Sequence, residues 1–436
     1  MAFARLSLRK TVTAAVAGGT AILTWTATTG TATAQPVSAR TVSTGTVSTG
    51  TALDRQALAR TLDAVVEAGM YGTYSSVRDG RERWQGAAGV ADVRTKRPVT
   101  PGMLHRVGSI SKTFTAVAVL QQVARGRVDL DAPIGRYLPD LVPGPRGQAV
   151  TVRMLLNHTS GIGDYIAGAF PSLTRGSTES VDDNRFRTVR PEELVRFGLE
   201  APATGEPGKD WSYSNTNYVI AGLLLEKVTG TDAATYITRD VIRKAGLKNT
   251  LFPRTPFIPG PHSKMYESYY GLIDPPRDYS VYDSSWYSTA GAVVSTMSDL
   301  NTFYRTLLGG HLLGQRELAE MLRTVPVTDG DETFHYGLGI YAQDLPCGRF
   351  WGHDGAVIGA GTFSLSSPDG ARQLSLGINL MKYQRIDENG NIKDHPIDLA
   401  LGTHILQALC GPSTPKALTQ LPFTPFPTER LAAKTR

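Results

Sequence analysis

Apolar residues recur at helical spacing in several segments of the chain. Leu58, Leu62, Val65 and Val66 fall on one face at about 3.6 residues per turn and predict an amphipathic opening helix. A long apolar run predicts a buried helix that starts at Ser109 and extends to residue 124. Further helices are expected over 152–156, 218–227, 233–244 and 397–409.

Short segments with strand character lie on both sides of this helical stretch. Two strands are expected over 73–77 and 84–91, joined by a turn at Asp79-Gly80. Four antiparallel strands, separated by turn residues, are expected over 336–343, 349–352, 359–366 and 372–380. This order predicts an α/β (α+β) fold: an antiparallel sheet built from both chain ends, flanked by helices, with an inserted all-helical lobe at about 130–285.

The first residues have the pattern of a secretory signal peptide, expected over 1–34. A basic start with three cations precedes an uncharged run over 11–25, and Ala32-Thr33-Ala34 offers a small-x-small cleavage site. The run is too short and too rich in Thr and Gly to span ~30 Å of bilayer as a membrane anchor. We therefore expect a secreted, extracellular protein without stable membrane insertion.

Composition divides the remaining chain into three parts. Residues 35–52 are rich in Thr, Ser, Ala and Gly and predict a flexible leader. Residues 53–411 carry the helix and strand patterns and predict one large domain. Residues 412–436 are dominated by Pro and Thr and predict a disordered or processed tail.

Charge and composition exclude several classes of function. The net charge is +6, and removing the three cations of the signal leaves 6 − 3 = +3, which is too small to indicate a nucleic-acid partner. The sequence has no H-E-x-x-H, no G-x-S-x-G and no phosphate-cradling glycine loop, so we expect no metal and no cofactor. In an exported chain, Cys347 and Cys410 predict one disulfide, with two buried free thiols as the alternative.

Three short motifs carry residues suited to acyl transfer. Ser109-Ile110-Ser111-Lys112 opens the predicted buried helix, and a spacing of three places Ser109 and Lys112 one turn apart on one face. A serine hydroxyl becomes nucleophilic when a base takes its proton, and a desolvated lysine is such a base. The same S-x-x-K spacing also occurs at Ser7 and at Ser413, so alone the motif is weak.

The second and third motifs are also weak alone. Tyr213-Ser214-Asn215 offers a phenol for proton transfer and an amide for a substrate or for Lys112, but a loop tyrosine beside an Asn turn fits equally well. His353-Asp354-Gly355 is placed at the start of a strand expected over 356–365. An edge strand beside a serine supplies backbone N–H groups for an oxyanion hole, whereas a structural histidine is the alternative. His158-Thr159-Ser160-Gly161 is interpreted as a structural turn.

Together, in the order S-x-x-K, Y-x-N and H-x-G, the motifs resemble the serine β-lactamase-like and penicillin-binding protein superfamily. The resemblance is greatest to secreted D-alanyl-D-alanine carboxypeptidases with an H-x-G motif, and weaker to class C β-lactamases. It covers about 53–411, including both cysteines. The supporting phrases are Arg106-Val107-Gly108-Ser109, Asp129-Leu130-Asp131, Leu156-Asn157-His158, Tyr213-Ser214-Asn215-Thr216-Asn217 and Ala290-Gly291-Ala292-Val293.

The resemblance implies a role for each motif residue. Ser109 would be the nucleophile, Lys112 and Tyr213 would share the base and acid roles, and Asn215 and His353 would line the site. It further implies an oxyanion hole from the N–H groups of Ser109 and Ala356, pocket aromatics at Trp286 and Phe170, and β-lactams as covalent inhibitors.

Three positions depart from the carboxypeptidase pattern. Where the family binds the carboxylate of its substrate with an arginine and hydroxyls, this chain has Tyr341, Asp354 and Ala356. An acidic Asp354 would repel a carboxylate at a cost of a few kcal/mol at close range.

The sequence therefore predicts a secreted serine hydrolase that acts through an acyl-enzyme on peptides or amides containing D-amino acids. The main hypothesis is a D-alanyl-D-alanine carboxypeptidase-like enzyme whose substrates include cell-wall peptides. A D-stereospecific amidohydrolase, esterase or aminopeptidase-like enzyme is the alternative. A β-lactamase and a non-catalytic penicillin-binding sensor are further alternatives.

Overall fold

The computed structural model describes residues 53–329, 332–388, 391–411 and 427. The expected signal peptide (1–34) and leader (35–52) lie outside the described residues, as does the expected tail (412–436) except for residue 427. Within the described part of the chain, no helix combines the length and apolar character needed to cross a bilayer.

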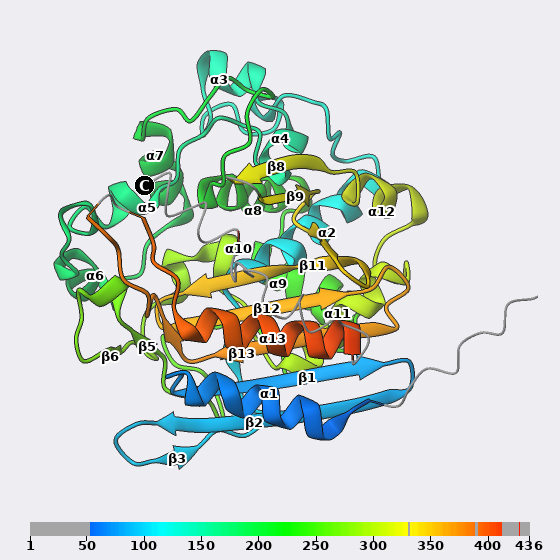
Figure 1. Cartoon of the computed structure of the whole chain (residues 1–436). Helices are drawn as coiled ribbons and strands as arrows, with labels where there is room; N and C mark the ends of the chain where they lie inside the picture. The colour runs from blue at the N-terminus through cyan, green and yellow to red at the C-terminus, as the bar shows by residue number, and fades with distance from the viewer. Residues whose placement is uncertain (1–52, 330–331, 389–390, 412–426, 428–436) are drawn as a thin grey trace, which may run out of the picture. The chain divides into compact units, whose positions relative to one another are not determined.

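A nine-stranded antiparallel sheet forms the centre of the fold, in the order β3-β2-β1-β13-β12-β11-β10-β9-β8 (Figure 1). The strands are β1 (Gly72–Asp79), β2 (Glu82–Asp92), β3 (Arg97–Pro98), β8 (Val325–Asp329), β9 (Glu332–Tyr336), β10 (Tyr341–Leu345), β11 (Gly348–Val357), β12 (Ala360–Ser366) and β13 (Arg372–Ile378). Strand β1 pairs with β13, with Thr73 opposite Ile378, so the sheet joins the two ends of the domain as expected.

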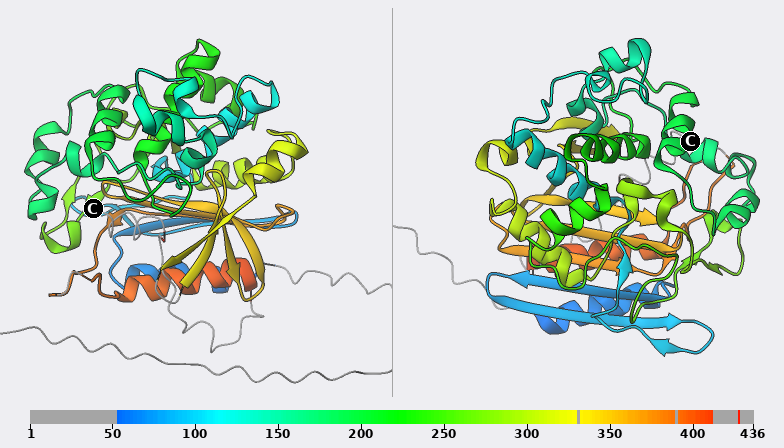
Figure 2. Two further views of the ribbon diagram at one scale, coloured as in Figure 1. Left: turned by 90° about the horizontal axis from the view of Figure 1, so that it is seen from above. Right: turned by 180° about the vertical axis from the view of Figure 1, so that it is seen from behind.

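Helices cover both faces of this sheet. Helices α1 (Arg55–Glu67) and α13 (Pro396–Cys410) pack side by side on one face, and α2 (Ser111–Ala124) and α11 (Met297–Leu308) lie on the other (Figures 1 and 2). The view from above shows the sheet between the two helical layers. Each face buries its own apolar cluster.

Local sequence explains where these helices begin. The Asp54 side chain accepts a hydrogen bond from Ala57 N, which caps α1, and Leu58 and Leu62 of that helix are buried. Helix α13 begins with Pro396 after a capping box formed by His395 and Asp398. Every residue of α2 from 111 to 122 is buried, as the long apolar run predicts.

The expected helical lobe is inserted between β4 and the later strands of the sheet. Its α-helices are α3 (Gly144–Ala149), α4 (Val152–Leu156), α5 (Ile166–Ala169), α6 (Glu179–Asn184), α7 (Pro191–Glu200), α8 (Asn215–Thr229), α9 (Ala233–Ile237) and α10 (Ser288–Gly291), followed later by α12 (Gln315–Met321). The remaining helical turns are η1 (Gly108–Ile110), η2 (Ile134–Arg136), η3 (Leu173–Arg175), η4 (Thr238–Ile242), η5 (Tyr269–Gly271) and η6 (Ser284–Trp286). Helix α2 contacts both α8 and, through η1, the strand β11.

Five short strands lie outside the nine-stranded sheet in the described part of the chain. Strands β4 (His105–Arg106) and β7 (Val294–Ser295) form one pair, and β5 (Tyr266–Glu267), β6 (Arg277–Asp278) and β14 (Leu380–Met381) form a small second sheet. Because β14 directly follows β13, this second sheet joins the helical lobe to the main sheet.

Two strand predictions are wrong in detail. Residues 336–343 do not form one strand, because a loop over 337–340 separates β9 from β10. The H-x-G motif lies near the end of β11 instead of before a strand over 356–365, because Ile358 and Gly359 form a two-residue turn to β12. Gly359 has a φ of +74°, which suits such a hairpin turn.

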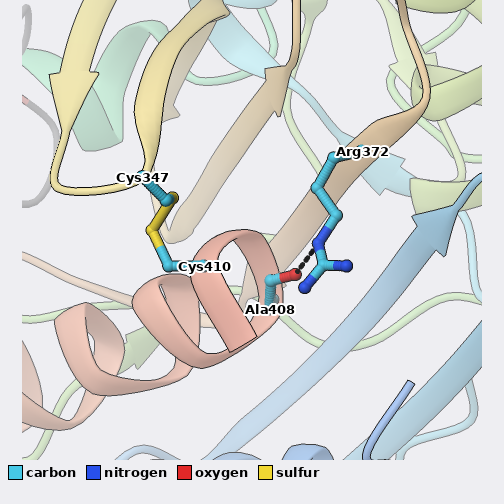
Figure 3. Close-up of a disulfide and its surroundings, with 4 residues drawn as sticks. All are labelled: Cys347, Arg372, Ala408 and Cys410. Atoms are coloured by element: carbon cyan, nitrogen blue, oxygen red, sulfur yellow. Dashed lines mark hydrogen bonds between the residues drawn. A yellow bond between two sulfur atoms is a disulfide. The ribbon is translucent and has the colours of Figure 1, made fainter. Parts of the chain in front are cut away.

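Cys347 and Cys410 form a disulfide, with a Cα–Cα distance of 5.4 Å (Figure 3). The bond joins the β10–β11 turn to the last residue of α13. Beside it, Arg372 Nε of β13 donates a hydrogen bond to Ala408 O at 3.0 Å. The end of α13 is thus attached to the sheet at two places.

Candidate active site

Ser109 lies in a tight helical turn directly before α2. Gly108 has a φ of +54°, which bends the chain into η1, and α2 follows from Ser111 instead of from Ser109 as expected. Ser109 is 8% exposed, and Lys112 one turn later is fully buried. Lys112 Nζ donates a hydrogen bond to Ser109 Oγ at 3.0 Å, so the first motif forms the expected pair.

Neutral oxygens hold the Lys112 ammonium group in place. Besides Ser109 Oγ, Nζ donates to Asn215 Oδ1 at 2.7 Å and to Ala290 O of α10 at 2.9 Å. An ammonium group has three N–H donors, and these contacts direct them at three acceptors from three parts of the chain. Asn215 of the second motif thus lies beside the serine–lysine pair.

A carboxylate fixes the orientation of the Asn215 amide. Asp164 Oδ2 accepts hydrogen bonds from Asn215 Nδ2 at 2.8 Å and from Asn215 N at 3.3 Å. Because the amide donates to Asp164, its oxygen faces Lys112. Asp164 belongs to the loop after His158-Thr159-Ser160-Gly161, and no spacing in the sequence marks it as part of the site.

Tyr213 contributes its ring to the surroundings of Lys112. Lys112 Nζ lies 4.8 Å from the centroid of the Tyr213 ring, within the range of a cation–π contact. Tyr213 is buried, and its ring packs against that of His158 at a centroid distance of 4.4 Å. The second motif therefore meets the first through both Tyr213 and Asn215.

His158 holds Tyr213 in place by accepting hydrogen bonds from the two residues on either side of it in the chain. Its backbone oxygen accepts from Ser212 N at 2.9 Å, and its Nδ1 accepts from Ser214 N at 3.2 Å. Because Nδ1 accepts a backbone N–H, the neutral ring carries its proton on Nε2. Burial, and then the charge of Lys112, lower the pKa of His158 well below its usual value. The sequence predicts a structural turn at His158, and no pattern in it indicates this support of Tyr213.

His353 lies behind the serine–lysine pair instead of lining the cavity beside it. The ring is fully buried, Nδ1 faces the backbone oxygen of Asp354, and Nε2 is 2.9 Å from Tyr336 Oη. Since Nδ1 donates to a carbonyl, Nε2 accepts from the phenol. Burial lowers the pKa of His353 to about 3, with a smaller contribution from Lys112, so the ring is neutral at physiological pH.

The backbone of β11 approaches Ser109 closely. A Cβ on Gly355 would lie 2.9 Å from Ser109 N and 2.0 Å from Val107 O, and one on Gly108 would lie 2.7 Å from Ala356 N. Strand β11 is not an edge strand as expected, because β10 pairs with it, but that ladder ends at Gly352. Residues 353–357 therefore have η1, instead of β10, beside them. The oxyanion hole from Ser109 N and Ala356 N stays a prediction.

A cavity opens at Ser109 between the lobe and β11. Its polar lining residues are Ser109, Asn215 and Lys382, and its aromatic ones are Phe170, Tyr269 and Tyr287. Aliphatic residues and the backbone region 356–358 complete the wall.

The expected pocket aromatics take different positions. Phe170 lines the cavity, whereas Trp286 packs on Phe170 with a ring-centroid distance of 4.7 Å. Trp286 Nε1 donates to Asn184 O at 3.0 Å, and Trp286 is not among the described residues that line the cavity. Trp286 therefore supports the wall from behind.

Tyr341 and Asp354 do not line the cavity, contrary to our expectation. Both are fully buried. The Tyr341 ring packs against Phe334 and His353, because β10 turns this residue into the cluster under α13. Asp354 lies close enough to Tyr341 to raise the pKa of that phenol further, beyond the larger effect of burial. Repulsion of a substrate carboxylate by an exposed Asp354 is therefore not the reason for the departure.

The described residues contain no group of three or more His, Cys, Asp or Glu side chains that could hold a metal ion. The Ser109 hydroxyl in the cavity lining is hydrogen-bonded to the Lys112 amine. A hydroxyl beside an amine in a largely buried setting is suited to nucleophilic attack on an acyl carbon.

Comparison with known proteins identifies the class. A family model described as Beta-lactamase matches residues 58–392. The antiparallel sheet with its helices is the β-lactamase/transpeptidase-like fold, as the motifs predicted, and the chain is related to penicillin-binding protein homologues and amidases. The chain belongs to the Beta-lactamase family.

Solved structures of similar fold include two amidohydrolases. A D-stereospecific amidohydrolase from Streptomyces sp. is 35% identical with a TM-score of 0.72, over 83% of this chain and 100% of that one. The D-amino acid amidase from Ochrobactrum anthropi SV3, solved with D-phenylalanine, is 25% identical with a TM-score of 0.69, over 81% and 98% of the two chains.

Similar curated proteins include a penicillin-binding protein and an esterase. Penicillin-binding protein 4* of Bacillus subtilis (strain 168) is 28% identical over 70% of this chain. Esterase EstB of Burkholderia gladioli is 34% identical over 46% of this chain. The alignments span 66% and 53% of the lengths of these two relatives.

Proposed function

We propose that this protein is a D-stereospecific serine amidohydrolase and esterase that forms an acyl-enzyme on Ser109. The observation that carries the proposal is the 3.0 Å hydrogen bond between Lys112 Nζ and Ser109 Oγ at the base of a cavity. The similarity to a D-stereospecific amidohydrolase over the whole of that chain supports amide substrates built from D-amino acids.

The first half of the reaction transfers the acyl group to the enzyme. Ser109 Oγ attacks the carbonyl carbon of a D-aminoacyl amide, a C–O bond forms, and the C–N bond breaks. The proton of the Ser109 hydroxyl passes by way of Lys112 and Tyr213 to the leaving amine. The N–H groups of Ser109 and Ala356 hold the carbonyl oxygen, and a donor in such a position is worth about 10²–10³-fold in rate.

The second half regenerates the enzyme. Water attacks the ester carbon, the bond to Ser109 Oγ breaks, and the D-amino acid or its N-substituted form leaves as a carboxylic acid. Lys112 takes a proton from this water and passes it to Ser109 Oγ, so one base serves both halves and the hydroxyl is restored. An ester substrate follows the same path with an alcohol as the leaving group.

Strict D-alanyl-D-alanine carboxypeptidase activity is the second candidate, favoured by the relation to penicillin-binding proteins. Such an enzyme must hold the free carboxylate of the residue that leaves. Tyr341 and Asp354, at the positions where the resemblance implies carboxylate-binding groups, are buried away from the cavity. This supports amides and esters over peptides with a free C-terminus.

Substrate turnover distinguishes the two candidates. We expect D-phenylalanine amide and ester derivatives to be hydrolysed with a kcat/KM at least tenfold above that for release of D-Ala from a D-Ala-D-Ala peptide. The L-enantiomers serve as controls and should react at least tenfold more slowly. Faster release of D-Ala would instead establish the carboxypeptidase, and equal rates for both enantiomers would refute the D-directed proposal.

Covalent labelling tests the nucleophile. A fluorescent penicillin should label the wild-type protein and the Ser160→Ala variant but not Ser109→Ala, with mass spectrometry placing the adduct on Ser109. An adduct that persists for hours argues against a β-lactamase, and ester hydrolysis by the same preparation argues against a non-catalytic sensor. Labelling of Ser109→Ala would refute the mechanism.

We also propose that the protein is exported and acts outside the cell, where small cell-wall peptides are accessible. The signal-like pattern over 1–34 supports this, as does the disulfide between Cys347 and Cys410, since such bonds persist in oxidising compartments. N-terminal sequencing of protein recovered from the culture medium should begin close to residue 35. Protein found only inside the cell with residue 1 retained would contradict the proposal.

A further inference from the structure

A second charged group faces the cavity that contains Ser109. Lys382, which follows β14, lines the cavity wall and is 8% exposed. Its Nζ lies 3.3 Å from Glu267 Oε2, and Glu267 is fully buried. Of the described residues that line this cavity, Lys382 is the cationic one.

Glu267 is committed to the protein by its other contacts. Its Oε1 accepts from Tyr269 N at 2.9 Å, and its Oε2 accepts from Gly359 N at 3.1 Å as well as from Lys382. Both carboxylate oxygens are therefore engaged, and Glu267 is not among the described residues that line the cavity. The charge presented to a ligand is the positive charge of Lys382.

The backbone around Lys382 has unusual conformations. Tyr269, Tyr270 and Lys382 have φ values of 45°, 60° and 47°, although none of them is a glycine. Tyr270 N donates to Lys382 O at 2.7 Å, so the three residues form one unit of the wall. Non-glycine residues with positive φ persist where the surroundings enforce them, and they cluster at ligand-binding sites. The position of Lys382 is thus imposed by the fold.

The backbone of β11 connects the part of the cavity at Ser109 with the Glu267–Lys382 pair. Ala356 lies against the Ser109 segment, and Val357 and Ile358 continue the lining toward Gly359, whose N–H binds Glu267. A substrate with its carbonyl at Ser109 and its acyl portion along β11 therefore directs that portion toward Lys382. The lining of the same cavity also includes Phe170 and several aliphatic side chains.

We propose that Lys382 is a specificity determinant that selects substrates whose acyl portion carries an acceptor oxygen beyond an apolar side chain. This inference rests on the proposed function of Ser109. The substrate class is N-acylated or peptidyl D-amino acid amides and esters, in which a carbonyl or carboxylate oxygen accepts from the Lys382 ammonium. A free α-ammonium group at the same place would meet a like charge.

Three substrates that differ only at the amino group test the proposal. The 4-nitroanilides of D-phenylalanine, N-acetyl-D-phenylalanine and N-succinyl-D-phenylalanine supply an ammonium, a carbonyl and a carboxylate. We expect the wild-type kcat/KM for both N-acylated substrates to exceed that for the free amine at least tenfold. A higher value for the succinyl than for the acetyl substrate identifies a carboxylate as the preferred acceptor, and equal values identify the amide carbonyl.

Variants of Lys382 test whether this side chain causes the preference for N-acylated substrates. Lys382→Met should remove the tenfold preference, and Lys382→Arg, which keeps the charge, should retain most of it. Lys264→Met is the matched control, because Lys264 forms an ion pair with Asp278 at 2.9 Å and is not among the described residues that line the cavity. A preference unchanged in Lys382→Met, or a wild-type enzyme that prefers the free amine, would overturn the inference.

Labelling by fluorescent penicillin separates this failure from failure of the proposed function. If wild-type protein takes no label and hydrolyses none of the three anilides, the proposed function of Ser109 fails. If it takes label and hydrolyses them while the Lys382→Met ratios match wild type, only the role of Lys382 fails. Retained labelling of Lys382→Met shows that the variant is folded.

Discussion

Two buried lysines have very different surroundings: Lys382 lines the cavity, and Lys112 is bonded to Ser109. Lys112 donates to a hydroxyl, an amide oxygen and a backbone carbonyl, all of them neutral. Lys382 lies against the buried carboxylate of Glu267. These hydrogen bonds of Lys112 are therefore all with neutral oxygens, one of them the Ser109 hydroxyl, whereas Lys382 forms an ion pair.

The two lysines also differ in how each is connected to a carboxylate. The Asn215 amide links Lys112 to Asp164, because its oxygen accepts from the lysine and its nitrogen donates to the acid. Glu267 contacts Lys382 directly. An intervening amide positions an amine and keeps it apart from the negative charge.

Removing each lysine should affect activity in different ways. Lys112→Met removes the base and should lower kcat/KM for every substrate by about 10²–10⁴-fold. Lys382→Met should act only on the choice among acyl groups. Parallel kinetics with the three anilides measure both variants, with calorimetry as a check of folding. A similar loss for both variants on every substrate would remove the distinction between the lysines.

Neutralising Asp164 tests the relay through Asn215. Asp164→Asn removes the charged acceptor that orients the Asn215 amide, and a hydrogen bond to a charged group is worth about 1.5–3 kcal/mol. We therefore expect kcat/KM to fall roughly 10–100-fold, since about 1.4 kcal/mol corresponds to tenfold. Asp182→Asn is the matched control, because Asp182 pairs with Arg277 outside the cavity lining. Equal activity of both variants would contradict the role of Asp164.

His158 should affect turnover through the position of Tyr213. His158→Ala removes the acceptor for Ser214 N, and we expect kcat to fall about tenfold with little change in KM, as for loss of a group that acts in the transition state. His158→Asn supplies an oxygen near the Nδ1 position and suits the φ of +62°, so it should restore most of kcat.

The two His158 variants must be compared at equal stability, with the melting temperature as the measure. If both lose kcat equally although both remain folded, the hydrogen bond to Ser214 is not the means by which His158 acts. A change confined to KM would assign His158 to substrate binding instead.

The smallest effect expected per residue is on the pH dependence of the free energy of unfolding. Burial lowers the pKa of His353 and of His404 to about 3 and that of His105 to about 4, against about 6.5 in the unfolded chain. Below pH 6.5 the unfolded state then binds more protons than the folded state. The free energy of unfolding should therefore decrease as the pH is lowered, by up to about 1.4 kcal/mol per pH unit for each histidine.

Urea unfolding at pH 7.5, 6.5 and 5.5 measures this slope. His404 of α13, bonded to Thr61 and Ser75, lies on the opposite face of the sheet from α2, so His404→Gln should reduce the slope and leave turnover intact. A free energy of unfolding that stays constant from pH 7.5 to 5.5 would show that these histidines are not buried in neutral form. The test therefore measures the stability of the protein independently of the turnover that depends on Lys112 and Lys382.

Periodicity and motif order predicted much of the fold and part of the site. The apolar spacing of α1 and α13 and the S-x-x-K and Y-x-N motifs are local patterns. Ser109, Lys112 and Asn215 met because two helices each present one motif at their start. The structure therefore agrees with those predictions whose geometry is determined within a short segment of the chain.

Contacts between distant loops could not be predicted in this way. Asp164, Glu267 and Lys382 lie in segments without periodicity, and only the folded chain brings each to the cavity wall or behind it. Strand β11 was placed wrongly because its sequence mixes glycines and charged residues with aromatic ones and lacks the alternation that marks a half-exposed strand, although the strand is buried from Phe350 to Gly355. His353 and Asp354 were expected to line the site from the resemblance, which does not show that both side chains are buried.

The pairing of β1 with β13 has a consequence for the order of events during synthesis. Thr73 Oγ1 donates to Gly377 O, 304 positions later in the chain, so β1 has no β13 partner until nearly the whole domain has left the ribosome. Such distant contacts form slowly. The nucleophile is made early, yet β11, which supplies the backbone beside it, arrives late. The nascent polypeptide thus stays inert while it is being produced.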